Sequence, residues 1–230
     1  MEAVRRPQTL TDAAVQHLSD AIVRGEIPPG TSLAEVPVAQ QLKTSRGTVR
    51  EALRQLSELG LVEINPHQGA RVMRFTAERA TEIFGLRSVL NAYAARLIAA
   101  KGLINHDLLQ EMREAMVELD DAVRSGDRFR LVLADESFHH RLNLYCGNAL
   151  LLDHLESLHA PTRLLLLAVQ TLETDPAQVS FNHRPIIAAI ERGDGDALVS
   201  AITEHIESSG KRLLRTMQET KHDVIVPALG

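Results

Sequence analysis

The stretch TSRGTVREALRQLSELGLVEINPHQGARV, residues 44–72, decides the fold of the N-terminal part of this chain. Apolar residues at helical spacing run from Ser45, a favourable N-cap, to Gly60, a favourable helix terminator, and predict one helix. The β-prone segments LVEI and ARVMRF follow, joined by NPHQG, whose Asn, Pro and Gly favour a tight turn. The stretch therefore predicts a helix that leads directly into a β-hairpin.

Two more helices are predicted before this stretch. Apolar residues recur at helical spacing over residues 10–24, where GEIPPG ends the pattern, and a short helix fits EVPVAQQL, residues 35–42. Three helices followed by a hairpin is the element order of a winged helix-turn-helix. We therefore expect residues 1–75 to form a winged helix-turn-helix domain.

From Thr76 onward the sequence shows helical periodicity and no strand pattern. Amphipathic segments with short connections predict helices at roughly 76–100, 105–125, 127–145, 148–173, 182–192 and 195–219. Six helices with short connections favour an all-α bundle. The expected fold class is therefore mainly α, with an N-terminal winged helix-turn-helix and a C-terminal all-α six-helix bundle over residues 76–230.

The composition is that of an ordinary soluble globular protein, with 44% hydrophobic and 24% charged residues in a chain of 230. The start of the chain has no apolar signal segment, and the most apolar run, RLLLLAVQTL, is too short to cross a bilayer. We therefore expect a cytoplasmic protein without a membrane partner. The single cysteine, Cys146, excludes an internal disulfide and a cysteine-rich zinc site.

The formal net charge of −5 is unevenly distributed along the chain. Residues 1–75 hold 9 Lys and Arg against 8 Asp and Glu, and the remainder holds 16 against 22. A net acidic protein is not expected to bind polyanions over its whole surface. Any contact with nucleic acid must therefore be local.

Arg46 and Arg50 lie one helical turn apart at the start of the last helix of the winged helix-turn-helix. In such a fold this end enters the major groove of DNA, where an arginine can bind guanine O6 and N7 with two hydrogen bonds. The alternative is a solvated face of ion pairs, in which the acidic partners of the two arginines would be Glu35, Glu51, Glu58 or another acid.

Other residues of this domain are candidates for contact with the DNA backbone. Ser45 and Thr48 offer hydroxyl groups at the N-terminus of the same helix, where phosphates bind favourably. His67, in the hairpin turn, is expected to reach the minor groove or a phosphate.

Residues 10–74 resemble the DNA-binding half of the GntR family of bacterial transcription regulators. The resemblance lies in IVRGEIPPGTSL, residues 22–33, and in residues 44–72. In residues 44–72 the helix ends, the arginines and the glycine of the wing, Gly69, all occur where the family pattern has them. It implies binding to double-stranded operator DNA, with Gly69 among the DNA-binding residues. At Gly47 and Thr48 the family often has a bulkier residue and a proline, so the operator sequence stays open.

Four residues of the C-terminal half combine into a candidate metal site. Asp135 and His139, within LADESFHHRLNLY, are one helical turn apart beside an apolar stripe. His183 and His205 also lie on apolar faces, eleven residues before and after Asp194. If their helices form an antiparallel hairpin, both imidazoles are about 16 Å from the turn and can meet.

One carboxylate and three imidazoles make a suitable ligand set for a divalent metal ion, Zn²⁺ or Ni²⁺ foremost and Mn²⁺ or Fe²⁺ as further options. Each residue also has a simpler interpretation. A buried histidine can be a neutral core residue bonded to a backbone carbonyl, and Asp135 with His139 can be a carboxylate–imidazole pair. The convergence of all four residues is harder to explain without a metal.

This half resembles the FCD domain, the all-helical effector-binding and oligomerisation domain of the FadR-like GntR subfamily. The motif D-x-x-F-H is matched by Asp135, Phe138 and His139. A downstream H-x-x-I-x-x-A-I starts at His183, and His205 follows GD-x-x-A at the expected spacing. The resemblance implies that the aspartate and the three histidines bind a metal ion. Six helices rather than seven resemble the VanR-type branch.

Arg87 lies among apolar residues on the buried arc of its helix, where a guanidinium needs an anion. The simpler interpretation is a structural salt bridge, for example to Asp135. The family resemblance implies instead that Arg87 holds the carboxylate of a small organic-acid effector, and Asn91 stands where relatives usually have a glutamate. Further candidates for the effector pocket are Arg130, Asn148 and Arg163.

The sequence as a whole predicts a bacterial transcriptional regulator rather than an enzyme. We expect a homodimeric repressor that binds operator DNA, a divalent metal ion and a small carboxylic-acid effector. A metal-dependent hydrolase is the alternative, but no general base or nucleophile motif accompanies the four ligands. A sensor of the metal itself is a third possibility.

Overall fold

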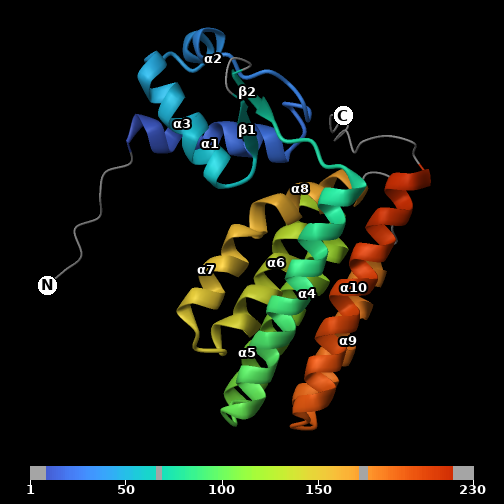
Figure 1. Cartoon of the computed structure of the whole chain (residues 1–230). Helices are drawn as coiled ribbons and strands as arrows, with labels where there is room; N and C mark the ends of the chain where they lie inside the picture. The colour runs from blue at the N-terminus through green and yellow to red at the C-terminus, as the bar shows by residue number, and fades with distance from the viewer. Residues whose placement is uncertain (1–8, 66–68, 171–175, 220–230) are drawn as a thin grey trace, which may run out of the picture. The chain divides into compact units, whose positions relative to one another are not determined.

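A computed structural model of the chain describes residues 9–65, 69–170 and 176–219. The chain divides into two compact units, one formed mainly by residues 1–74 and one by residues 75–224. Figure 1 shows the helices and strands of both units. None of the described helices is long and apolar enough to cross a membrane.

The N-terminal unit is a winged helix-turn-helix, which confirms the prediction. Its elements are α1 (Leu10–Val23), α2 (Glu35–Gln41), α3 (Arg46–Glu58), β1 (Val62–Asn65) and β2 (Gly69–Val72). Ser45 caps α3 because its hydroxyl oxygen accepts a hydrogen bond from the backbone N–H of Thr48 at 3.1 Å. The apolar face of α3 packs against α1, α2 and β1, and its buried residues are Val49, Ala52, Leu53 and Leu56.

The two strands form an antiparallel hairpin, with Val62 opposite Val72 and Asn65 opposite Gly69. The buried Val62 and Val72 anchor the hairpin to the core of the unit. Gly69 has a φ of +79°, a backbone conformation that glycine adopts without strain, where the chain enters β2. His67, expected in the hairpin turn, lies outside the described residues.

The C-terminal unit is an all-α bundle with seven helices in its described residues, one more than the sequence predicts. They are α4 (Ala77–Ala100), α5 (His106–Ser125), α6 (Arg128–Leu144), α7 (Ala149–Ser157), α8 (His159–Gln170), α9 (Pro176–Glu191) and α10 (Gly195–Glu219). The mainly α class and the two-part architecture are confirmed. The count of six helices was wrong, so it gives the VanR-type branch no support.

The additional helix has a local cause in Pro161. The single helix expected over residues 148–173 is α7 followed by α8, with a break at Leu158. A proline has no N–H for the carbonyl four residues earlier and its ring crowds that turn, so an unbroken helix through Pro161 is disfavoured. Proline is well accepted in the first turn of a new helix, as in α8. Helix α9 also extends further towards the N-terminus than the predicted 182–192, because it already includes Pro176, the first described residue after residue 170.

Helix α10 packs along α4 and against α9, and α5 packs against α6 and α9. Figure 1 shows α10 lying alongside α4. Gly210 permits this close approach, because a Cβ at this position would lie 2.9 Å from the Cβ of Phe84 on α4. The fully buried core residues of the bundle include Ile98, Phe138 and Ile186. The packing brings α6, α9 and α10 together around one region of the core.

Candidate functional site

Four side chains from three helices converge in the core of the bundle. Asp135 and His139 project from α6, His183 from α9 and His205 from α10. One ligand atom from each residue lies within 4.8 Å of the other three. Nε2 of His139 is 3.1 Å from Nε2 of His205, and Nε2 of His183 is 3.3 Å from Oδ1 of Asp135. The structure thus brings together all four residues that the sequence selects.

This convergence follows from the local sequence. Helices α9 and α10 form a hairpin whose turn contains Gly193, at a φ of +66°. His183 and His205 are at nearly equal distances along the chain from this turn, so their side chains reach the same level of the bundle. One helical turn separates Asp135 from His139 on α6, so both project from the same side of that helix.

Backbone carbonyl groups fix how two of the imidazoles face the cluster. Nδ1 of His183 lies 2.8 Å from the carbonyl oxygen of Val179, and Nδ1 of His205 lies 3.2 Å from that of Asn182. A carbonyl oxygen only accepts hydrogen bonds, so each Nδ1 carries a proton and donates it. Each Nε2 therefore presents a lone pair to the cluster, as in metal-bound histidines whose other nitrogen is held by the protein.

Burial keeps the three imidazoles neutral. Loss of hydration lowers the pKa of His183 and lowers the pKa of His139 and His205 well below the usual value. The charge of Asp135 opposes the lowering of the His183 pKa only in part. With His183 neutral, its Nε2 and the carboxylate oxygen of Asp135 are two acceptors that face each other at 3.3 Å. A cation between them would remove this repulsion.

The spacing of the ligand atoms suits a transition-metal ion. Metal–ligand bonds of about 2.1 Å place neighbouring ligand atoms about 3.0–3.4 Å apart in octahedral or tetrahedral coordination. The separation of Nε2 of His139 from Nε2 of His205, 3.1 Å, and that of Nε2 of His183 from Oδ1 of Asp135, 3.3 Å, lie in this range. Three neutral imidazoles and one carboxylate could therefore hold a divalent ion, with coordination positions left for another ligand.

A small cavity adjoins the cluster. Residues of α4, α6, α7 and α8 form its wall, and Asp135 and His139 belong to both the wall and the cluster. The polar residues of the wall also include Arg87, Asn91, Asn143 and Thr162. A molecule in this cavity would therefore lie next to an ion held by the cluster.

Arg87 is buried in this wall, with 9% of its surface exposed. Within the described part of the chain its guanidinium forms no hydrogen bond or ion pair, and it lies over the ring of Phe84, 5.2 Å from the ring centre. Burial lowers the pKa of Arg87, and the charges of Asp135 and Glu136 offset this in part. The salt bridge to Asp135, the simpler interpretation, is not formed between these two described residues. A buried guanidinium is costly unless an anion reaches it.

The other predicted effector residues are placed differently. Arg163 lines the cavity, but its guanidinium donates two hydrogen bonds to the carboxylate of Glu136, at 2.6 and 2.8 Å. Arg130 is exposed in the first turn of α6, away from the cavity wall. Asn148 is the N-cap of α7, where its side chain accepts a hydrogen bond from the N–H of Leu151 at 3.1 Å. Arg130, which faces solvent, and Asn148, which caps a helix, therefore do not line this cavity.

Asn143 and Thr162 line the cavity but were not selected from the sequence. Asn143 follows His139 by one helical turn, as His139 follows Asp135. This row of three polar residues on one side of α6 is the signal that could have revealed Asn143. Thr162 has no such companion in the sequence.

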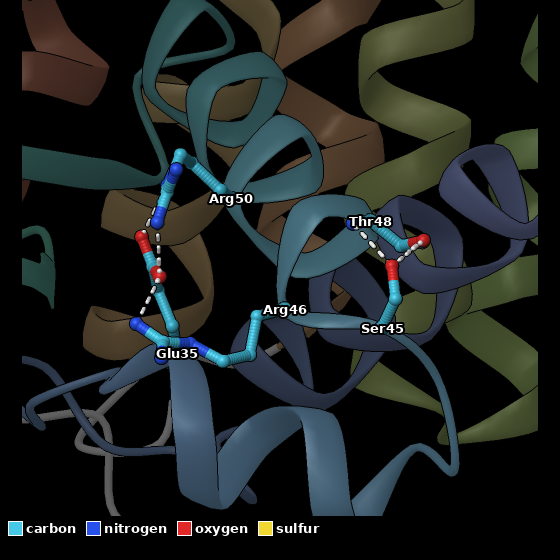
Figure 2. A network of polar contacts seen from close by, with 5 residues as sticks. All are labelled: Glu35, Ser45, Arg46, Thr48 and Arg50. Atoms are coloured by element: carbon cyan, nitrogen blue, oxygen red, sulfur yellow. Dashed lines mark hydrogen bonds and ion pairs between the residues drawn. The ribbon is translucent and has the colours of Figure 1, made fainter.

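At the start of α3, Arg46 and Arg50 share one acidic partner (Figure 2). Nε and Nη2 of Arg50 donate to the two carboxylate oxygens of Glu35 on α2 at 2.7 and 2.8 Å, and Nη2 of Arg46 donates at 3.5 Å. Both arginine side chains remain largely exposed. Glu51 and Glu58, the other acids considered, pair with a different arginine of α3. The ion-pair alternative is thus formed through Glu35, and it leaves both guanidiniums at the surface.

The other described candidates of this unit, Ser45, Thr48 and Gly69, lie around the same end of α3. The hydroxyl oxygens of Ser45 and Thr48 lie 2.9 Å apart at the N-terminus of the helix (Figure 2). Gly69 lines a surface hollow together with Arg46 and Arg50. The structure therefore places the arginines and the wing glycine around one surface.

Two protein-family models match this chain. The model for bacterial regulatory proteins of the gntR family matches residues 10–72, and the FCD domain model matches residues 82–208. The two matches fall on the N-terminal unit and on the bundle that contains the four-residue cluster.

Individual proteins give the same result. A probable D-xylose utilization operon transcriptional repressor of Paenarthrobacter nicotinovorans is 33% identical over 210 residues, which cover 90% of this chain and 91% of that protein. The galactonate operon transcriptional repressor of Escherichia coli (strain K12) is 28% identical over 88% of this chain and 96% of that protein. Among solved structures, E. coli McbR/YncC shares the fold with a TM-score of 0.73 at 22% identity, covering 90% of this chain and 98% of that chain.

Proposed function

We propose, on the premise that this chain belongs to the GntR family of bacterial regulatory proteins as a member with an FCD domain, that a metal ion and a small organic acid control its repression of transcription. Family membership makes the protein a transcriptional repressor rather than an enzyme. The metal and effector part rests on one observation, the four-residue cluster that adjoins the cavity of Arg87. We assign operator binding to residues 1–75 and effector binding to residues 76–230.

The cluster binds one divalent ion through the carboxylate of Asp135 and the imidazoles of His139, His183 and His205. Support comes from the Nε2 lone pairs of His183 and His205, which are presented to the cluster, and from the neutral state of the buried imidazoles. Three nitrogen ligands favour Zn²⁺ or Ni²⁺, and the carboxylate also suits Mn²⁺ or Fe²⁺. When bound, the ion supplies positive charge and open coordination positions beside the cavity.

The effector is a small organic acid whose carboxylate pairs with Arg87. A guanidinium that is buried without an anion costs free energy, and a carboxylate can recover this cost through two parallel hydrogen bonds. Arg163 is a secondary contact in the same wall, since Glu136 already balances its charge. The name of one relative, the galactonate operon repressor, refers to an organic acid.

The N-terminal end of α3 contacts the operator. Two exposed guanidiniums at the first turn of a helix are suited to bind base edges in the major groove, and hydroxyl groups at the same end are suited to bind phosphates. The proposed DNA-binding residues are Ser45, Arg46, Thr48, Arg50, His67 and Gly69.

The protein acts as a homodimer on an operator with two-fold symmetry. Three apolar residues on one side of α4 are between 47% and 66% exposed: Leu86, Val89 and Tyr93. Together they form an apolar stripe that a second copy of the chain would cover. We expect Val89→Glu to convert a dimer to a monomer in size-exclusion chromatography with light scattering. Val117→Glu, on the exposed face of α5, is the control and should leave the dimer intact. A dimer in both variants would contradict this surface.

A sensor of the metal itself is the second candidate, because four protein ligands can hold an ion without an effector. Fluorescence anisotropy of labelled operator DNA separates the two. Metal-stripped protein is titrated with Zn²⁺ alone, with galactonate, malate or citrate alone, and with Zn²⁺ and each acid together. Our proposal expects release from the operator only with metal and acid together. Release by Zn²⁺ alone would favour the metal sensor, and no release in any mixture would contradict both.

A further inference from the structure

The cavity wall holds two buried polar side-chain atoms that have no hydrogen-bond partner among the described residues. These atoms are Oδ1 of Asn143 and Oγ1 of Thr162. Asn143 is 3% exposed and Thr162 is 5% exposed, and both line the cavity. Buried polar atoms in folded proteins are nearly always paired, so these two atoms indicate what the cavity binds.

Two hydrogen bonds in series fix the orientation of the Asn143 amide. Nδ2 of Asn91 donates to the backbone carbonyl of Arg87 at 2.9 Å, because a carbonyl can only accept. Oδ1 of Asn91 therefore accepts from Nδ2 of Asn143 at 2.8 Å. The remaining amide atom of Asn143 is its Oδ1, an acceptor that requires a donor.

An ionised carboxylate has no hydrogen to donate. A ligand whose only polar group is a carboxylate would satisfy Arg87 and leave Oδ1 of Asn143 buried and unpaired. A hydroxyl group both donates and accepts, so it can donate to Oδ1 of Asn143 and share a hydrogen bond with the hydroxyl of Thr162. Oδ1 of Asn143 therefore favours a ligand with a hydroxyl group, while the hydroxyl of Thr162 can pair with a hydroxyl group or a carboxylate.

The charge that the wall would have with a bound metal ion disfavours the other common donor, an ammonium group. The guanidiniums of Arg87 and Arg163 are matched in number by the carboxylates of Asp135 and Glu136. A divalent ion on the cluster would therefore make the wall positive. A positive wall repels a second cation and attracts an anion.

We propose that the effector is a hydroxy acid. Its carboxylate pairs with Arg87, and one of its hydroxyl groups donates to Oδ1 of Asn143 and shares a hydrogen bond with Thr162. This inference rests on the proposed function and narrows the effector to a chemical class. A site built to bind a hydroxyl group rejects the analogue without it, because the protein acceptor is then left unpaired.

Matched pairs of acids test the proposal by isothermal titration into full-length protein loaded with Zn²⁺. The pairs are malate with succinate, lactate with propionate, and galactonate with hexanoate. We expect wild type to bind the hydroxylated acid roughly tenfold more tightly, or better, in at least one pair. Equal or tighter binding of the deoxy acid in all three pairs would overturn the hydroxy-acid proposal and leave acid binding intact. Binding of none of the six acids would overturn the proposed effector function as well.

Two variants of similar volume assign the preference to the wall residues. In Asn143→Leu we expect the hydroxylated-to-deoxy affinity ratio to fall to within about threefold of one, with one metal ion per chain retained. In Thr162→Val we expect a partial fall. Thr203→Val is the control and should leave the ratio unchanged, because the Thr203 hydroxyl donates to the carbonyl of Val199 within α10 at 2.7 Å.

Two outcomes would overturn the assignment. If Asn143→Leu weakens both acids of a pair equally, Asn143 has a structural role and does not bind the hydroxyl group. If Asn143→Leu does not fold, Thr162→Val provides the test. A hydroxylated-to-deoxy affinity ratio in Thr162→Val equal to that of wild type would then contradict the proposal.

Discussion

Nε2 of His183 and Oδ1 of Asp135 face each other at 3.3 Å in the core of the bundle. The proton of the neutral His183 is on Nδ1, which donates to the carbonyl oxygen of Val179, so the two facing atoms are both acceptors. Burial lowers the pKa of His183, which disfavours a second proton on this imidazole. A divalent ion between these atoms would turn an unfavourable contact into two coordinate bonds.

Arg87→Met should abolish effector binding and also raise the stability of the protein. Methionine keeps much of the length of the side chain and removes a buried charge that has no ion pair among the described residues, a gain of about 1 kcal/mol or more. Urea unfolding measures the stability, and calorimetric titration with the acid measures binding.

Arg163→Met is the matched control for Arg87→Met, because it removes a guanidinium that does have a partner. It leaves the carboxylate of Glu136 without its two hydrogen bonds, so it should lower the stability. A loss of stability in Arg87→Met as well would show that Arg87 is a structural residue.

Arg50→Ala should weaken operator binding about 10-fold to 100-fold without unfolding the domain, because it removes an arginine placed to contact a base edge. Fluorescence anisotropy with operator DNA at fixed salt measures the affinity, and circular dichroism checks the fold. Binding to an unrelated duplex should change much less. An operator affinity equal to that of wild type would contradict the placement of α3 on DNA.

Glu35→Gln should reduce the discrimination between operator and unrelated DNA. Glu35 holds the guanidiniums of Arg46 and Arg50, and the hydrogen bonds from Arg50 lower the pKa of Glu35, which keeps it charged. The neutral glutamine frees both arginines and removes a charge that repels phosphates, so we expect binding to unrelated duplex to rise about threefold or more.

The control for Glu35→Gln is Glu58→Gln. Glu58 pairs with Arg54 on the same helix, so this variant makes the same chemical change without touching the pair of arginines at the helix start. It should leave the operator-to-unrelated affinity ratio unchanged. If both variants alter the ratio equally, Glu35 contributes only its charge and does not position Arg46 and Arg50.

The winged helix-turn-helix was predictable from sequence because its signals are local. The N-cap at Ser45, the turn segment NPHQG and the helical spacing between them each involve neighbouring residues. The convergence of His183 and His205 was predictable because two regular helices joined by a short turn place equidistant residues side by side. Because helices are regular, the number of residues between a side chain and the turn determines which distant side chain it meets.

Features that depend on a single packing contact or a single helix break were harder to predict from the sequence. Pro161 divides a segment whose apolar pattern continues on both sides, so periodicity alone predicted one helix. Arg130 and Asn148 have the chemistry of effector ligands, but their positions at helix starts place one in solvent and make the other a cap. The choice of Glu35 as the partner of the arginines depends on how α2 packs on α3.

The most direct test of the central claim is the metal content of purified protein, determined by elemental analysis after growth with Zn²⁺ and removal of loosely bound ions. His183→Ala is compared with His140→Ala, which changes a histidine next to the cluster in the chain but outside it. We predict one ion per chain in wild type and in His140→Ala, and a loss of most of the metal in His183→Ala. Equal metal content in the two variants, or no metal in wild type, would contradict a metal centre built from Asp135 and the three histidines.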